Sequence, residues 1–208
     1  MGTAGEIQQF FYAIILRFSG FGFFSVSLNK NQNSMKIIAF GGSNSKSSIN
    51  KQLATFTASL FYNASVEVLD LNDYEMPLFG VDIEKEIGHH KLAKAFMDKL
   101  ASADLLIVSM AENNGNYSVA FKNVFDWCSR ITKSIFQDKD MVLLATSTGA
   151  RGGATVLDIA KNAFPRYGAN IKVTFSLPSF NENFDTEKGE ISNTILRHEL
   201  RKLIETNF

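Results

Sequence analysis

The sequence predicts an α/β protein built on a doubly wound sheet of five parallel strands, with helices on both faces to give three layers. The order of apolar and helical segments supports this fold class. From residue 36 onward, continuous apolar runs of strand length alternate with segments of helical period, which is the pattern of parallel strands buried on both faces. Right-handed crossovers then place the helices on the two sides of the sheet. We expect the strand order 2-1-3-4-5, which brings the loops after the first, third and fourth strands together.

Each predicted strand is a short apolar run bounded by polar or glycine-containing segments. In chain order, the strands are expected near Lys36 to Phe40, Ser65 to Leu71, Leu105 to Met110, Met141 to Thr146 and Asn170 to Phe175. A segment with helical spacing follows or precedes each of them. These helices are expected at Ser48 to Tyr62, His89 to Ser102, Ser118 to Lys133, Gly152 to Arg166 and Ser192 to Thr206.

The composition is that of an ordinary globular protein with one core, because 45% of the 208 residues are hydrophobic and 20% are charged. Lysine plus arginine and aspartate plus glutamate both number 21, so no charge excess points to nucleic acid or an anionic membrane. A single cysteine, Cys128, excludes an internal disulfide. With one cysteine and only three histidines, we expect no metal site. Because the chain cannot form an internal disulfide, we expect it in the reducing cytoplasm.

The first 34 residues differ from the rest. Phe10 to Phe24 is apolar and aromatic but is interrupted by Arg17, Ser19 and glycines, so it is too short and too broken for a membrane span. An acid near the start argues against a signal peptide. We interpret residues 1–34 as an extension outside the fold and residues 35–208 as the domain. We therefore expect the native chain to start at Met35.

The segment Gly41 to Asn50, GGSNSKSSIN, links the first strand to the first helix. A strand that turns directly into a helix aims unpaired backbone N–H groups and the positive end of the helix dipole at one point. Hydroxyls and amides surround that point, and Lys46 is the only formal cation in the segment. These features predict a phosphate site. The alternative is a serine-rich turn in which Ser47 or Ser48 only caps the next helix.

Two further loops carry unusual chemistry. Ala111 to Tyr117, after the third strand, contains three asparagines and a glycine, and Ser147 to Gly153, after the fourth, is rich in glycine. Amides pair with both donors and acceptors, and bare backbone can lie against a flat ring. In the following helix, Cys128 has core spacing, so we expect it to pack rather than react. We expect Trp127 to fill the core or an interface.

These residues resemble the NADPH-dependent FMN reductases, a family with a flavodoxin-like fold. The first motif of that family, G-S-x-R-x-x-S-x-N, is matched by Gly42, Ser43, Ser48 and Asn50. The places of the second motif are held by Glu112, Asn114, Lys122, Asn123, Asp126, Trp127, Ser129 and Arg130. The third, Ser-x-Gly-x-x-Gly-Gly, is matched by Ser147, Gly149, Gly152 and Gly153. The resemblance covers Met35 to about Phe208.

The resemblance implies an enzyme that binds FMN, takes hydride from NADPH or NADH and reduces a small acceptor such as a quinone, flavin, azo compound or metal oxyanion. It implies no catalytic side chain and a homodimer or homotetramer, with the segment around Trp127 and Phe136 at the interface. The implied phosphate contacts are Ser43, Ser45, Lys46, Ser48, Ile49 and Asn50. The implied ring contacts are Glu112, Asn113, Asn114, Gly115, Ser147, Thr148, Gly149 and Gly152.

Two departures from the family pattern bear on function. Ser45 stands where the family has arginine, which removes a charge-assisted contact that Lys46 would replace only in part. Ala111 and Asn113 replace a proline and a tyrosine, so an amide stands where an aromatic ring would flank the flavin. Two alternatives stay open. One is an FMN-binding electron carrier that never meets nicotinamide, and the other is a fold that binds a different phosphorylated ligand.

Overall fold

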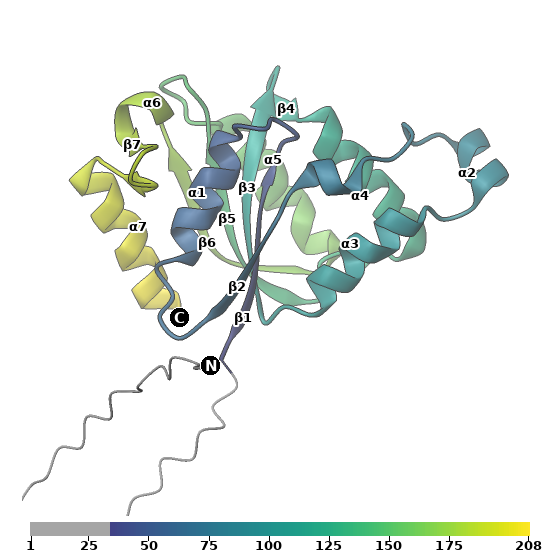
Figure 1. Ribbon diagram of the computed structural model, residues 1–208, viewed down its shortest axis with the longest axis horizontal. Coiled ribbons are helices and arrows are strands. Elements are labelled where there is room, and N and C mark those ends of the chain that lie inside the picture. The colour runs from purple at the N-terminus through teal and green to yellow at the C-terminus, as the bar shows by residue number, and fades with distance from the viewer. Residues whose placement is uncertain (1–33) are drawn as a thin grey trace, which may run out of the picture. The chain divides into compact units, whose positions relative to one another are not determined.

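The computed structural model describes residues 34–208 (Figure 1). Residues 1–33, which hold nearly all of the predicted extension, lie outside the described residues. Five parallel strands form the central sheet, in the order β2-β1-β3-β5-β6. They are β1 (Lys36–Gly42), β2 (Ser65–Leu69), β3 (Leu105–Asn113), β5 (Lys139–Thr146) and β6 (Ala169–Leu177). With the short antiparallel β4 (Asn116–Tyr117) set aside, this is the predicted order 2-1-3-4-5, which is confirmed.

The three predicted layers are also confirmed. Successive residues of a strand face opposite sides, so Ile37 and Ala39 of β1 pack in one core while Ile38 and Phe40 pack in the other. The first core includes side chains of α1 (Ile49–Ala58) and α7 (Thr194–Asn207). The second includes side chains of α3 (Lys91–Ala101), α4 (Val119–Ile131) and α5 (Ala154–Ala163).

Several short elements were not predicted from the sequence. They are η1 (Leu71–Tyr74), α2 (Val81–Ile87), β4, η2 (Phe164–Tyr167), α6 (Phe180–Asn183), β7 (Phe184–Asp185) and β8 (Glu190–Ile191). Such elements are too short to show a clear hydrophobic period. The predicted helix to Arg166 is also too long, since α5 ends at Ala163 and η2 takes over with Pro165 in its first turn, where proline is tolerated.

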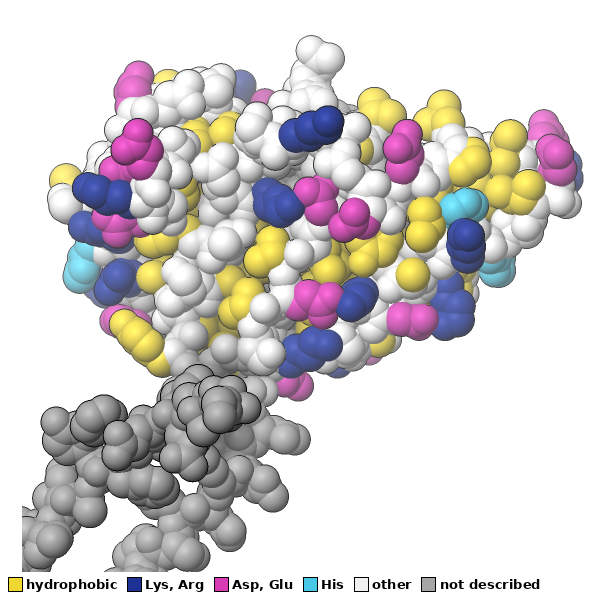
Figure 2. All heavy atoms as spheres, in the orientation of Figure 1, with side chains coloured by type: hydrophobic (Ala, Val, Ile, Leu, Met, Phe, Trp, Pro, Cys, Tyr) yellow, Lys and Arg dark blue, Asp and Glu magenta, His cyan; other side chains and the backbone are white. Residues whose placement is uncertain are grey.

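The helix α2 has no buried residue. Its side chains Val81, Ile83 and Ile87 and the preceding Leu78 are all exposed apolar groups. In Figure 1 α2 projects from the body of the domain, and in Figure 2 hydrophobic side chains gather over the same end. Exposure of these apolar side chains to water is unfavourable in free energy, and a clustered apolar surface of this kind often marks an interaction site.

Candidate functional site

The three polar loops meet at the carboxyl end of the sheet, where a cavity of about 360 Å³ opens. It is lined by Ser43, Ser45, Ser47, Ser48, Ile49, Asn50, Ala111, Glu112, Asn113, Thr146, Ser147 and Thr148. Nine of the fourteen predicted site residues are in this set. Lys46, Asn114, Gly115, Gly149 and Gly152 are not. Ser47, Ala111 and Thr146 also line the cavity but are not among the fourteen, although Thr146 ends β5 and leads directly into a polar loop.

The β1–α1 turn is tight because α1 begins directly against the end of β1. A Cβ atom on Gly41 would lie 2.4 Å from the backbone nitrogen of Lys51 and 2.9 Å from the carbonyl carbon of Asn50. Only glycine lets the first turn of α1 sit there. Gly42 is less constrained, because its nearest neighbour would be the flexible end of Met110 at 3.3 Å.

The N-terminus of α1 forms one end of the cavity. Ser48 caps the helix, with its Oγ accepting a hydrogen bond of 3.1 Å from the Lys51 N–H. The N–H groups of Ile49 and Asn50 have no acceptor in the part of the chain that the structure describes. Capping and anion binding are thus compatible here, since the cap uses one first-turn donor and leaves others toward the cavity.

The side chain of Asn50 is committed to the fold. It is 3% exposed. Its Nδ2 donates to the Thr146 carbonyl oxygen at 3.2 Å, and its Oδ1 accepts from the Thr146 N–H at 3.1 Å and from Ser109 Oγ at 2.7 Å. The amide therefore ties α1 to β3 and β5. The groups that Asn50 offers to a ligand are those of its backbone.

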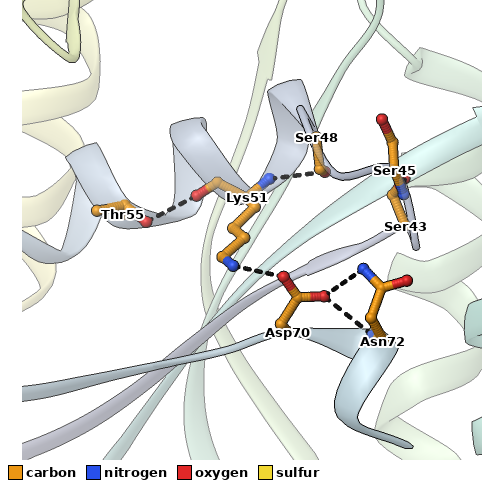
Figure 3. Close-up of polar contacts among 7 residues, drawn as sticks. All are labelled: Ser43, Ser45, Ser48, Lys51, Thr55, Asp70 and Asn72. Carbon is orange, nitrogen blue, oxygen red and sulfur yellow. Dashed lines mark hydrogen bonds and ion pairs between the residues drawn. The ribbon is translucent and has the colours of Figure 1, made fainter. Parts of the chain in front are cut away.

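The two lysines near the loop do not line the main cavity. Lys46 and Lys51 both border a separate hollow of about 340 Å³ on the other side of Ser47 and Ser48. The ammonium of Lys51 lies 2.6 Å from Asp70 Oδ2, as Figure 3 shows. The hydrogen bond from Lys51 lowers the pKa of the Asp70 carboxyl below its ordinary value. Among the described residues, the end of the cavity at the N-terminus of α1 is therefore lined mainly by hydroxyls and amides rather than by charged side chains.

The predicted loop from Ala111 to Tyr117 is a β-hairpin in the structure, so the third strand runs three residues beyond its predicted end at Met110. Asn113 pairs with Asn116, and the two residues between them, Asn114 and Gly115, have φ of 52° and 74°. An Asn-Gly pair with both residues in the left-handed region is the common two-residue hairpin turn. The Asn-Gly pair was therefore the feature of the sequence that could have predicted the hairpin. The turn carries Asn114 and Gly115 away from the cavity lining.

Glu112 links the hairpin to α5. Its Oε2 accepts a hydrogen bond of 3.0 Å from the Val156 N–H in the first turn of that helix. The helix has no cap from its own N-cap residue, Gly153. A carboxylate at this place satisfies a free donor and interacts favourably with the helix dipole. Glu112 therefore lines the cavity with an orientation that α5 determines.

The third loop is shaped by close packing at its glycines. At Gly152, where φ is 57°, a Cβ atom would lie 2.5 Å from Ser176 Oγ and 2.8 Å from the Leu177 carbonyl oxygen. Gly149 is not crowded, and its carbonyl accepts a hydrogen bond of 3.0 Å from the Ser179 N–H. The Phe180 N–H donates to the Ser147 carbonyl at 3.0 Å. These bonds hold Ser147 and Thr148 at the cavity.

Residues of the second motif on α4 support the site from within the core. Trp127 is fully buried and donates from Nε1 to the Pro77 carbonyl at 2.8 Å. Phe136 is 1% exposed, so neither of these two side chains is accessible to a partner, and an interface at the surrounding segment stays a prediction. Cys128 is buried as predicted, and burial raises the pKa of its thiol to about 12. A thiol in this state is not a nucleophile at neutral pH.

Comparison with known proteins agrees with this geometry. The sequence profile of the NADPH-dependent FMN reductases matches residues 35–182. A 2-hydroxy-1,4-benzoquinone reductase from Burkholderia sp. is 29% identical over 175 residues, which is 83% of this chain and 91% of that protein. An NADPH:quinone oxidoreductase from Arabidopsis thaliana is 24% identical over 177 residues, which is 82% of this chain and 88% of that protein.

A solved structure shows the same fold. FerB from Paracoccus denitrificans, a flavoenzyme NAD(P)H:(acceptor) oxidoreductase, superposes with a TM-score of 0.65 at 20% identity, covering 83% of this chain and 94% of that one. The strand order, the three converging loops and the profile match lead to one conclusion. The chain belongs to the NADPH-dependent FMN reductase family, whose members are NAD(P)H oxidoreductases.

Proposed function

We propose that the protein binds FMN in the cavity of about 360 Å³ and catalyses electron transfer from NADPH or NADH to a small acceptor. The observation that carries this proposal is the convergence of all three polar loops on one cavity. For a quinone acceptor the balanced reaction is NAD(P)H + H⁺ + quinone → NAD(P)⁺ + hydroquinone. When bound, the flavin supplies the two-electron chemistry.

The lining of the cavity fits FMN in two parts. The phosphomonoester would lie at the N-terminus of α1, where the backbone N–H groups of Ile49 and Asn50 and the hydroxyls of Ser43 and Ser45 are donors. The flat ring system would lie along the opposite wall. That wall is formed by Glu112, Asn113, Ser147 and Thr148.

The remaining predicted contacts act indirectly in this proposal. Gly152 allows the third loop to approach β6, and Asn114 with Gly115 closes the hairpin that presents Asn113. Lys46 adds positive potential from the far side of the phosphate turn. No acid, base or nucleophile is required of the protein, because its part is to position the cofactor and exclude competing reactions.

The visible spectrum of the purified protein tests this function. After incubation with FMN and removal of the excess, we expect an absorption band at about 450 nm, and we expect NADPH or NADH to bleach it rapidly without oxygen. A bound flavin that neither nucleotide bleaches would favour the electron-carrier alternative. No bound flavin would mean that the cavity holds a different phosphorylated ligand.

We also propose that the protein is a cytoplasmic homodimer or homotetramer. The exposed apolar side chains of Leu78, Val81, Ile83 and Ile87 support an assembly through α2 rather than through Trp127. In the residues that the structure describes, no helix has the length and hydropathy to cross a bilayer. Analytical ultracentrifugation of the wild type and of Val81→Glu with Ile87→Glu tests the assembly. A double variant with the wild-type sedimentation coefficient would exclude α2.

A further inference from the structure

A second cavity, of about 370 Å³, adjoins the proposed flavin site. Asn113 lines both cavities. At the phosphate turn, Ser43 lines the flavin site and the next residue, Asn44, lines the second cavity. The two spaces therefore share a boundary along the β1–α1 turn and the end of β3. A molecule in the second cavity would lie beside a flavin ring held between Asn113 and Ser147, which is the arrangement that electron transfer requires.

One wall of this second cavity is apolar. It includes the buried side chains of Leu71, Tyr74 and Met76. At the rim, Leu78 is 72% exposed and Val119 is 71% exposed. Large apolar groups exposed at the mouth of a cavity gain free energy when an apolar ligand covers them. The wall thus suits the face of a ring and its alkyl substituents.

The polar side chains of the second cavity differ in whether they already form hydrogen bonds within the protein. Asn123 donates to the carbonyls of Met76 and Pro77 and accepts from the Phe79 N–H, so it holds the wall in place. Asn72 donates from Nδ2 to Asp70. The side-chain amides of Asn44 and Asn113, by contrast, have no hydrogen-bond partner in residues 34–208. Both are free to donate to the carbonyl oxygen of a ligand.

The charge that lines the second cavity is negative. Among residues 34–208, Glu75 is the only charged residue that lines it, and no lysine or arginine does. The lysine of α4, Lys122, is paired with Asp126 at 2.6 Å. A carboxylate at the mouth lowers the local concentration of anions and repels a bound anionic group.

From these observations we propose that the second cavity is the acceptor site, that it takes an uncharged ring with carbonyl oxygens, and that Glu75 discriminates against anionic acceptors. The inference rests on the proposed function and narrows its acceptor range. Free flavin nucleotides and metal oxyanions are disfavoured, because they carry negative charge. The accepted ring gains two electrons and two protons, one hydride equivalent coming from the nicotinamide through the flavin and one proton from solvent.

The test compares two quinones in the FMN-loaded protein. The neutral acceptor is 2-methyl-1,4-naphthoquinone, and the anionic one is 1,4-naphthoquinone-2-sulfonate. We expect the ratio of kcat/KM for the sulfonate to kcat/KM for the neutral quinone to rise about threefold in Glu75→Gln and further in Glu75→Lys at low ionic strength. Added salt should reduce the difference between the variants. Glu187→Gln, an exposed carboxylate at the β7–β8 turn, is the matched control and should change neither value.

The outcomes separate this inference from the proposed function. If neither NADPH nor NADH bleaches a bound flavin, the proposed function fails, and the acceptor site fails with it. If the flavin is bleached but neither quinone reoxidises it, the acceptor inference alone is overturned. It is also overturned if both quinones are reduced and the ratio of their kcat/KM values is the same in the wild type, Glu75→Gln and Glu75→Lys.

Discussion

The side-chain amide of Asn50 pairs with both backbone groups of Thr146, with Nδ2 donating to the carbonyl oxygen at 3.2 Å and Oδ1 accepting from the N–H at 3.1 Å. The two residues are 96 positions apart in the chain. The pair joins the first turn of α1 to the end of β5, so two of the three loops around the cavity are held at a set distance. The sequence motif identifies Asn50, but only the structure shows that its side-chain amide bonds α1 to β3 and β5.

We predict that Asn50→Ala destabilises the fold by at least about 3 kcal/mol, since buried partners left unsatisfied cost about 1 to 3 kcal/mol each. Ser109 Oγ and the two backbone groups of Thr146 would lose this partner. Urea unfolding of the protein without FMN gives the free energy directly. Asn44→Ala, at an exposed amide of the same loop, is the control. Equal midpoints for the two variants would contradict the structural role of Asn50.

Two glycines of the cavity loops should respond differently to alanine. At Gly41 the added Cβ would meet backbone atoms at 2.4 Å and 2.9 Å, which cannot move without shifting α1. At Gly149 the nearest atom would be Ser147 Oγ at 3.9 Å, an ordinary contact. We therefore expect Gly41→Ala to lower the melting temperature strongly and to weaken FMN binding. Gly149→Ala should leave the melting temperature and the FMN affinity close to wild type. A large loss of FMN affinity in this variant would show that the ligand closely approaches the backbone of Gly149.

Ser45→Arg should tighten FMN binding. Ser45 lines the phosphate end of the proposed flavin site, where none of the described residues contributes a charged side chain to the lining. A hydrogen bond to a charged group contributes about 1.5 to 3 kcal/mol, and a guanidinium can bind a phosphate with two N–H groups. A flavin fluorescence titration would show a Kd at least about tenfold lower. Ser45→Gln, which is long but neutral, is the control, and equal affinity for both variants would mean that the charge does not reach the phosphate.

The Lys51–Asp70 ion pair predicts a pH dependence of stability. The pKa of the Asp70 carboxyl is lowered in the folded chain, first by the hydrogen bond from Lys51 and then by the Asn72 N–H. A carboxyl with a depressed pKa in the folded state stabilises the fold above its unfolded pKa, about 3.9. That stabilisation is lost as the pH falls through the folded pKa.

Asp70→Asn should therefore be less stable than the wild type at pH 7, by no more than about 1 kcal/mol because the pair is partly exposed. The difference should shrink as the pH falls below about 4. Urea unfolding at several pH values measures it, with Asp73→Asn at an exposed neighbouring carboxylate as the control. A deficit that stays constant down to pH 2 would show that Asp70 acts through packing instead.

The sequence was sufficient for the class of fold, the strand order and the positions of the three loops. These features follow from hydrophobic periodicity and from the polar segments after Phe40 and Thr146, which are properties of neighbouring residues. The Asn-Gly turn at Asn114 was also readable from the sequence and was missed. Short elements such as α2 could not be predicted from the sequence, since its seven residues have no buried face and therefore show no hydrophobic periodicity.

Only the tertiary structure decided what the individual polar side chains do. That Asn50 binds Thr146, that Lys51 binds Asp70, and that Glu112 binds the start of α5 depend on which segments the sheet brings together. The same holds for the separation of the cavity that carries Glu112 from the second cavity that carries Glu75. The physical reason is that local patterning specifies which face of an element is buried. Hydrogen bonds and ion pairs between residues far apart in the chain form only once those faces have packed.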